Sequence, residues 1–136
     1  MKVIVHTDGA SRGNPGPAAV GIVITDENGT VLVELSEYIG ETTNNVAEYR
    51  ALLRGLQEAV RLNAKEVLIY GDSQLMIKQM NGEYRVRHPN LVPLYNDARN
   101  MVRSLGQVSF TYVPRSKNTR ADELANQALD GYLKKA

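Results

Sequence analysis

The sequence contains no cysteine and no tryptophan, and it has only two histidines. The lack of cysteine excludes disulfide bonds and thiolate metal sites. Because only His6 and His88 could offer imidazole, we do not expect a structural zinc site. Any metal would therefore be held by oxygen ligands, which favours magnesium, manganese or calcium.

The sequence also has little net charge and no long apolar run. Its formal net charge of +1 neither indicates nor excludes a nucleic-acid partner, because local clusters matter more than the sum. No signal peptide precedes the first predicted strand and no apolar run reaches membrane length, so we expect a cytoplasmic protein. The 136 residues and the hydrophobic content of 43% are typical of one globular domain, which we expect to span residues 1–136.

Hydrophobic periodicity predicts five strands and four helices in the order β-β-β-α-β-α-α-β-α. The short turns between the first three strands predict an antiparallel meander, and the crossover helices imply parallel pairing among the first, fourth and fifth strands. We therefore expect an α/β protein, a mixed sheet with helices on both faces. The predicted strands are 3–8, 18–25, 30–39, 67–70 and 108–113, the predicted helices are 46–62, 73–80, 91–105 and 122–133, and the basic stretches 84–89 and 115–119 are predicted to be irregular.

Four acidic residues lie near the beginnings and ends of these elements. Asp8 and Asp72 come at the carboxyl ends of short apolar strands, which is the edge of an open α/β sheet where ligands bind. Glu48 continues the apolar face of its helix, so its carboxylate could point inward over the sheet. Asp122 opens the last helix. If these elements are neighbours, three or four carboxylates converge.

Each carboxylate also has a purely structural explanation. Asp8 can belong to an Asp-Gly turn, and Asp72 can cap the helix that follows it. Glu48 and Asp122 can be the fourth residues of capping boxes. Converging carboxylates without a cationic partner would repel one another strongly, and divalent cations would remove that repulsion. Two hard ions about 4 Å apart could clamp the attacking and leaving oxygens of a phosphodiester, which predicts a phosphoryl-transfer nuclease.

Four blocks of the sequence strongly resemble type 1 ribonuclease H in their order and spacing. The blocks are TDGASRGNPG (7–16), TTNNVAE (42–48), GDSQ (71–74) and NTRADELA (118–125). The resemblance leaves essentially none of the chain for a second domain. It implies the ribonuclease H fold with strand order 3-2-1-4-5. It also implies hydrolysis of the RNA strand of RNA–DNA hybrids, with 5′-phosphate and 3′-hydroxyl products.

The resemblance further implies a metal-binding catalytic set, with two Mg²⁺ ions as cofactor and Mn²⁺ as the alternative metal. In the family pattern Asp8 bridges both ions, and Asp122 helps to hold the ion that activates the nucleophilic water. Glu48 and Asp72 help to hold the ion that stabilises the leaving oxygen. The implied catalytic and metal-binding residues are Asp8, Glu48, Asp72 and Asp122.

The resemblance also implies contacts with the substrate. Asn14, Asn45 and Gln74 match amides that bind the hybrid in its minor groove, and neutral amides suit that task because they both donate and accept hydrogen bonds. Thr43, with Asn14, resembles a pocket for a DNA-strand phosphate. A turn role for Asn14 and a capping role for Asn45 remain open. The implied substrate-binding residues are Gly9, Ser11, Arg12, Asn14, Thr43, Asn44, Asn45 and Gln74.

Two features depart from the family pattern. Arg115 lies in a loop where many members carry a histidine, and since arginine cannot shuttle protons at neutral pH, we expect it to act electrostatically in catalysis or else to be a solvated loop residue. The basic, tryptophan-rich insertion of several members is reduced to residues 82–88. Arg85 and Arg87 there offer modest phosphate contacts, so we expect weak, salt-sensitive binding. We also expect no separate hybrid-binding domain.

Two other functions remain open. The same fold could cut a broader range of substrates, such as double-stranded RNA or DNA, or it could be a non-catalytic nucleic-acid-binding module. The amides Asn14, Asn45 and Gln74 favour a strand with 2′-hydroxyls, and the intact acidic quartet argues against a binding module. The sequence implies no obligate protein partner and a monomer. We expect His6 to be packed beside the first strand and His88 to be a turn residue.

Overall fold

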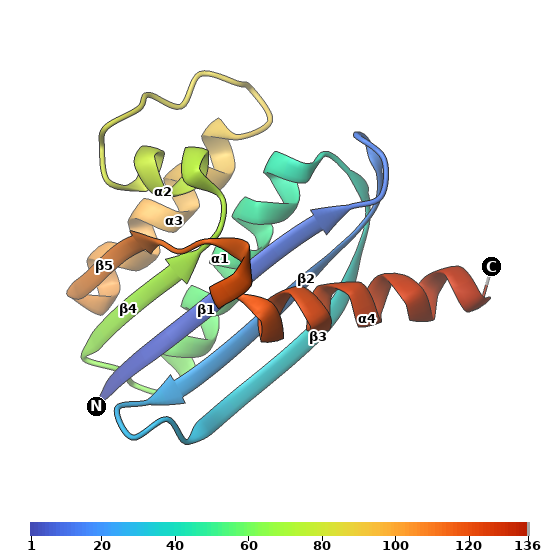
Figure 1. The fold of residues 1–136 in the computed structure, drawn as a ribbon. Coiled ribbons are helices and arrows are strands. Elements are labelled where there is room, and N and C mark those ends of the chain that lie inside the picture. Colours follow the sequence, from blue (N-terminus) through green and yellow to red (C-terminus); the bar gives the residue numbers. More distant parts are fainter. Residues whose placement is uncertain (136) are drawn as a thin grey trace.

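The computed structural model describes residues 1–135, and these form a five-stranded sheet with helices on both faces (Figure 1). The elements follow the predicted order, with one short 3₁₀-helix in addition. The strands are β1 (Lys2–Ser11), β2 (Gly16–Asp26), β3 (Val31–Thr42), β4 (Glu66–Gly71) and β5 (Gln107–Tyr112). The helices are α1 (Asn44–Arg61), α2 (Gln74–Met80), α3 (Val92–Leu105), the 3₁₀-helix η1 (Arg115–Lys117) and α4 (Thr119–Lys135).

The strand order in the sheet is β3-β2-β1-β4-β5, as the resemblance implied. The meander of β1, β2 and β3 is antiparallel, whereas β4 pairs in parallel with both β1 and β5. The predicted mixed α/β sheet is therefore confirmed. Thr7 of β1 lies opposite Gly71 of β4, so the residues that follow them, Asp8 and Asp72, come to the same edge of the sheet.

The ends of most elements differ from the prediction by one to three residues, and two of these differences bear on the acidic residues. β1 continues to Ser11 because residues 9–11 pair with residues 18–20 of β2, which satisfies their backbone groups. Asp8 therefore lies within a strand, and its interpretation as part of an Asp-Gly turn is wrong. Helix α4 begins at Thr119 rather than at residue 122, and η1 precedes it in the stretch that was predicted to be irregular.

Helix α1 packs on one face of the sheet through its predicted apolar face. Gly55 allows a close approach, because a Cβ atom there would lie 3.0 Å from Val5 Cγ1 and 3.1 Å from Thr7 Cγ2. Val60, near the C-terminal end of α1, is 45% exposed. The buried residues of the face include Tyr49, Leu52, Gly55, Leu56 and Ala59.

Helix α4 crosses the opposite face of the sheet (Figure 1). A Cβ atom on Gly21 of β2 would lie only 2.0 Å from the carbonyl oxygen of Ala121 and 2.7 Å from the nitrogen of Ala125. The first turns of α4 are therefore held against β2, which brings Asp122 towards Asp8 on the neighbouring strand. Among the residues that the structure describes, no helix is both long and apolar enough to span a membrane.

Candidate active site

Three acidic side chains from three elements meet at the carboxyl edge of β1 and β4. Asp8 comes from β1, Glu48 from α1, and Asp72 directly follows β4. Each offers a carboxylate oxygen, and these oxygens lie within 4.8 Å of one another. Asp8 is 4% exposed and Glu48 is 5% exposed. The structure therefore brings together three of the four predicted carboxylates, of which Asp8 and Glu48 are buried and Asp72 is half-buried.

Gly9 fixes the position of Glu48. Its backbone N–H donates a hydrogen bond of 2.7 Å to Oε1 of Glu48. A Cβ atom on Gly9 would lie 2.1 Å from the carbonyl group of Ala47, so only glycine lets α1 approach β1 this closely. The capping-box explanation of Glu48 is wrong, because Thr43 is the N-cap of α1 and its side chain accepts from the N–H of Val46.

The capping explanations also fail for the other two carboxylates. Ser73, not Asp72, caps α2 by accepting a hydrogen bond of 3.2 Å from the N–H of Met76. Asp122 lies in the first turn of α4, which begins at Thr119, and its Oδ1 accepts from Nη2 of Arg115 at 3.0 Å. Asp122 also contributes to the raised pKa of Asp8. Asp122 therefore extends the acidic cluster on its α4 side.

Burial and repulsion make the cluster hard to ionise. Burial, together with the neighbouring carboxylates, raises the pKa of Asp8 to about 9. Burial also raises the pKa of Glu48 to about 8, although the hydrogen bond from Gly9 opposes that shift. Oδ2 of Asp8 is buried without a hydrogen-bond partner. A divalent cation would satisfy that oxygen and displace the protons, so this all-oxygen donor set fits magnesium or manganese.

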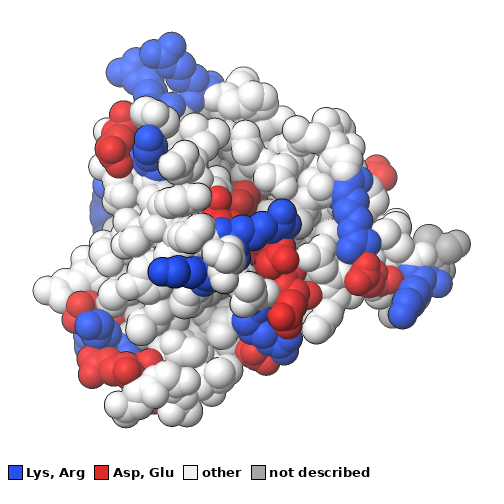
Figure 2. All heavy atoms as spheres, in the orientation of Figure 1, with Lys and Arg blue, Asp and Glu red and all other residues white. Residues whose placement is uncertain are grey.

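An open cavity of about 280 Å³ lies over this cluster, and we call it the acidic cavity. Figure 2 shows acidic and basic side chains next to one another near the middle of this face of the molecule. Tyr112 was not predicted to line the cavity, although it ends β5 at the same sheet edge as Asp72, which is a signal that could have identified it. The lining residues are Asp8, Gly9, Ala10, Asn44, Glu48, Asp72, Tyr112 and Arg115.

A second cavity, of about 210 Å³, lies beside the first turn of α1, and we call it the amide pocket. It groups three of the predicted contact residues, and Oδ1 of Asn14 accepts from the N–H of Asn44 at 3.0 Å. Asn14 does lie in the turn between β1 and β2, whereas Asn45 is not the N-cap of α1. The lining residues are Asn14, Thr43, Asn45, Val46, His88 and Leu91.

His88 joins the amide pocket from a distant part of the chain. Its carbonyl oxygen accepts from the N–H of Leu91 at 2.9 Å, which agrees with the predicted turn. Its place in the pocket was not predicted, because the loop that carries it meets α1 only in the folded protein. The local sequence contains no signal for that contact.

Three other predicted contact residues lie outside the amide pocket. The hydroxyl of Ser11 donates to the carbonyl oxygen of Thr42 at 2.9 Å, and Arg12 forms an ion pair of 2.7 Å with Asp130 of α4. These contacts hold the loop between β1 and β2 against its neighbours. Gln74 lies exposed in the first turn of α2.

Sequence comparison identifies relatives that match most or all of the chain. The family model described as "Reverse transcriptase-like" matches residues 6–128. The chain is 44% identical over 129 residues to Ribonuclease HI of Halobacterium salinarum, which covers 95% of this chain and 65% of that protein. It is 47% identical over 137 residues to a bifunctional protein of Mycobacterium tuberculosis, of which it spans 38%. The chain is thus shorter than these curated relatives.

Solved structures share the fold closely. The crystal structure of RNase H1 from Halobacterium salinarum matches with a TM-score of 0.94 at 44% identity, covering 96% of this chain and 99% of that one. The crystal structure of LC11-RNase H1 in complex with an RNA/DNA hybrid matches with a TM-score of 0.92 at 45% identity, covering 96% and 99%.

Proposed function

Since this chain belongs to the ribonuclease H family, we propose that it is an endonuclease that hydrolyses the RNA strand of RNA–DNA hybrids. The observation that carries this proposal is the convergence of Asp8, Glu48 and Asp72, whose carboxylate oxygens lie within 4.8 Å of one another. The relative that was crystallised with an RNA/DNA hybrid supports the choice of substrate. In this proposal residues 1–136 act as one catalytic domain.

The proposed cofactor is a pair of divalent ions, Mg²⁺ or Mn²⁺, held by the four carboxylates. The donor set fits because it contains only oxygen atoms and because Oδ2 of Asp8 is buried without a partner. Asp8 of β1, Glu48 of α1, Asp72 after β4 and Asp122 of α4 would hold these ions. When bound, such ions lower the pKa of a coordinated water and stabilise the charge of the transition state.

The carboxylates would organise a simple hydrolysis. The oxygen of a water molecule attacks the phosphorus, and the bond between phosphorus and the 3′-oxygen breaks. The 3′-oxygen takes up a proton, so the products carry 5′-phosphate and 3′-hydroxyl ends. The hydrogen bond from Gly9 to Oε1 of Glu48 leaves Oε2 of Glu48 available to the site. Gly9 therefore acts through Glu48 and positions it.

Amide side chains would bind the hybrid beside this site. Asn14, Asn45 and Gln74 are exposed and can both donate to and accept from base edges and 2′-hydroxyls in the minor groove. Asn44 lines the acidic cavity and would lie beside the RNA strand. Thr43 lines the amide pocket with Asn14 and Asn45. The contacts of Ser11 and Arg12 within the protein would hold the loop between β1 and β2, which carries Asn14, in place.

Arg115 would act electrostatically at the edge of the acidic cavity. Its guanidinium lies 3.0 Å from Asp122 while its side chain remains 73% exposed, so it can reach a substrate phosphate. Its hydrogen bond with Asp122 raises the pKa of Arg115 above its ordinary value, which keeps the group charged. A constant positive charge attracts a phosphate but cannot transfer a proton at neutral pH.

The test of the function is cleavage of a labelled RNA strand in an RNA–DNA hybrid and in an RNA duplex, with a labelled DNA duplex in parallel. Each substrate is incubated with magnesium, with manganese and with chelator, and Asp8→Asn serves as the inactive control. We expect metal-dependent cutting of the hybrid alone, which Asp8→Asn abolishes. Comparable cutting of the RNA duplex would broaden the substrate. If the folded protein cuts none of these substrates with either metal, the enzyme proposal is wrong.

A further inference from the structure

We propose that Asp130 of α4 is a positioning residue for substrate binding. It acts through Arg12 on the loop between β1 and β2 (residues 12–15), which we call the β1–β2 loop and which carries Asn14. In this inference Arg12 connects the loop to α4 and does not contact the substrate. The inference rests on the proposed function, because it concerns how the hybrid is bound. Asp130 lies outside the four sequence blocks that resemble the family.

Helix α4 already binds the guanidinium group of Arg12. Nη2 of Arg12 lies 2.7 Å from Oδ1 of Asp130, and it donates to Oδ1 of Asn126 at 3.3 Å. Two acceptors on α4 therefore hold the same nitrogen. The carboxylate of Asp130 also offsets the charge of Arg12 and would repel a phosphate brought to it. This arrangement suits a contact within the protein rather than a contact with a nucleic acid.

The β1–β2 loop is held on both faces of the sheet. The N–H of Arg12 donates to the carbonyl oxygen of Pro17 at 2.8 Å, which closes the loop. Oδ1 of Asn14 accepts from the N–H of Asn44 at 3.0 Å, where α1 begins. Arg12 thus reaches α4 and Asn14 reaches α1, and these two helices cover opposite faces of the sheet (Figure 1). The place of the Asn14 side chain, which is proposed to bind the minor groove, therefore depends on both contacts.

The same contacts connect the β1–β2 loop to Asp122. Asp122, Asn126 and Asp130 are spaced four residues apart, so they lie along one side of α4. Nδ2 of Asn126 donates to the carbonyl oxygen of Asp122 at 3.1 Å, while its Oδ1 accepts from Arg12. One amide group therefore joins Arg12 to the turn of α4 that carries Asp122. The distance between Asn14 and Asp122 follows from these contacts.

The carboxylate of Asp122 has other contacts that do not involve Asp130. Its Oδ1 accepts from Arg115 at 3.0 Å, and the N–H of Asp122 donates to the carbonyl oxygen of Asn118 at 3.1 Å. A change at Asp130 should therefore leave that carboxylate in place and shift the β1–β2 loop. The expected kinetic result is a higher KM with an unchanged kcat.

The experiment exchanges the two charges of the ion pair. Initial rates of hybrid cleavage give kcat and KM for the wild type, Asp130→Lys, Arg12→Glu and the double variant that carries both changes. Each single change replaces attraction with repulsion, so we expect KM to rise about fivefold while kcat changes by less than about twofold. The double variant restores the ion pair with its charges exchanged, and its KM should return to within about twofold of the wild-type value.

A second pair of variants tests whether the effect passes through Asn14. Asn14→Ala should raise KM by itself, because it removes a proposed contact with the substrate. When Asp130→Lys is added to Asn14→Ala, KM should rise further by less than about twofold, because the two changes disrupt the same contact.

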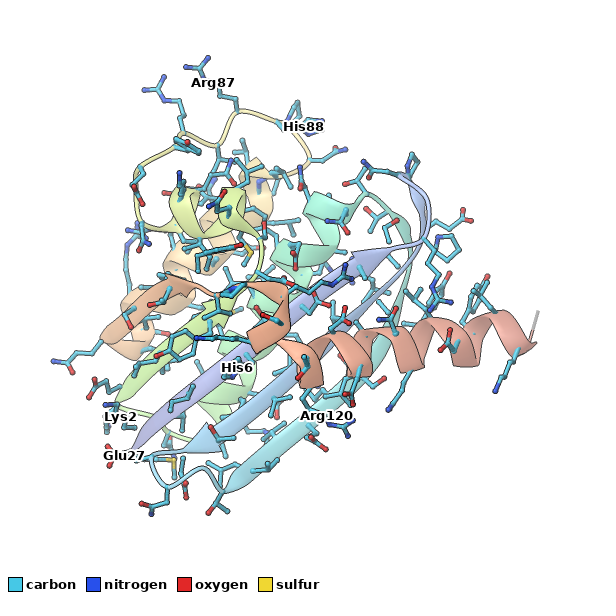
Figure 3. All side chains as sticks on the ribbon, viewed as in Figure 1. Lys2, His6, Glu27, Arg87, His88 and Arg120 are labelled. Atoms are coloured by element: carbon cyan, nitrogen blue, oxygen red, sulfur yellow. The ribbon has the colours of Figure 1, made fainter. Side chains whose placement is uncertain are left out.

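Glu34 of β3 supplies a matched control. It forms an ion pair of 2.7 Å with Arg120 of α4, the same distance as between Arg12 and Asp130. Figure 3 shows Arg120 near the start of α4, well away from the β1–β2 loop. Glu34→Lys changes the net charge by as much as Asp130→Lys does, and it should leave KM and kcat at their wild-type values. Thermal unfolding should change little and similarly in both variants, because both ion pairs are in contact with solvent.

Three results would overturn the inference. If the double variant keeps the full KM penalty of Arg12→Glu, Arg12 contacts the substrate directly. If Asp130→Lys leaves KM unchanged, α4 does not position the β1–β2 loop. If Asp130→Lys raises KM equally with and without Asn14→Ala, the effect does not pass through Asn14. All three results require a wild type that cuts the hybrid, so they are distinct from failure of the proposed function, in which no hybrid is cut.

Discussion

Two glutamates of α1 are equally shielded from water but have opposite electrostatics. Glu48 is 5% exposed and Glu58 is 7% exposed. Burial raises the pKa of Glu48 to about 8, whereas hydrogen bonds from Arg61 and Arg54 lower the pKa of Glu58. Burial therefore disfavours the charged form of Glu48, whereas the arginine partners of Glu58 favour its charged form.

The difference indicates which carboxylate serves the fold and which serves the site. Oε2 of Glu58 lies 2.7 Å from Arg54, and its Oε1 lies 2.7 Å from Arg61. Glu48 has the backbone N–H of Gly9 instead. Among the described side chains, none of the ion pairs includes Asp8, Glu48 or Asp72. A fold that pairs carboxylates at one end of a helix and leaves them without cations at the other is suited to a divalent metal at the second end.

The largest expected effect is the loss of activity in Asp8→Asn. Removing the central carboxylate should lower kcat for hybrid cleavage at least about 1,000-fold, because several kcal/mol of transition-state stabilisation depend on the metal site. The folded state should persist, since the change removes repulsion from the cluster. Steady-state kinetics and thermal unfolding measure the two effects. A variant that keeps more than about a tenth of the wild-type rate would show that Asp8 is not central to the site.

The pH dependence of stability above pH 5 should weaken when metal is added. The pKa values of Asp8 and Glu48 rise from 3.8 and 4.5 to about 9 and about 8 on folding. Their contribution to stability is therefore complete below about pH 4 and is lost as the pH rises through 8 and 9. With chelator present, the Tm should fall between pH 5 and pH 9, and metal should offset that fall increasingly as the pH rises.

Glu58, which is paired with Arg54 and Arg61, supplies the internal control for this experiment. Because the pKa of Glu58 is lowered on folding, its contribution is present above its ordinary value of 4.5 and is lost on acidification. The Tm should therefore also fall at strongly acidic pH, and metal should not change that branch. A Tm that is constant or rises from pH 5 to pH 9 in chelator would contradict the assignment of raised pKa values to the site.

Arg115 tests whether charge alone is needed beside the cluster. Arg115→Gln should lower kcat about tenfold, whereas Arg115→Lys should retain more of the rate because it keeps a positive charge. Neither change should alter the Tm, since the side chain is 73% exposed. Equal rates for Arg115→Lys and Arg115→Gln would argue against an electrostatic role.

The smallest expected effect is a loss of stability when Glu58, near the C-terminal end of α1, loses its charge. Glu58→Gln should lower the free energy of unfolding by about 1 kcal/mol, because the three hydrogen bonds from Arg54 and Arg61 weaken while Arg61 stays largely in water. Its kcat for the hybrid should equal that of the wild type. Urea denaturation measures the loss, with the exposed Glu27→Gln as a control (Figure 3). A loss of activity without a loss of stability would show that the two ends of α1 are coupled.

The fold could be predicted from the sequence because its local signals agree with its topology. Apolar strands, helical periodicity and crossover lengths predicted the element order and the parallel pairing of β1 and β4. The same pairing places Asp8 beside Asp72. The sequence misled where tertiary contacts replaced a local signal. Gly9 and Ser11 look like turn residues, but β1 continues through them because β2 pairs with them.

The carboxylates of the site could be predicted from the sequence, but some residues and contacts around the site could not. Asp8 and Asp72 could be found because a parallel sheet brings its strand ends to one edge. His88 could not, because only packing against α1 places it in the amide pocket. For the same reason, the ion pair between Arg12 and Asp130 of α4 leaves no trace in the sequence around either residue.

The central claim is that Asp8, Glu48 and Asp72, which have no arginine or lysine partner, form a site for divalent metal. The most direct test is a calorimetric titration of the protein with Mn²⁺ at a pH slightly above neutral, in two buffers with different ionisation enthalpies. We predict binding that releases protons, because the pKa values of Asp8 and Glu48 are raised, and we predict that Asp8→Asn abolishes it. Wild-type protein that binds no Mn²⁺, or that binds it without releasing protons, would contradict the claim.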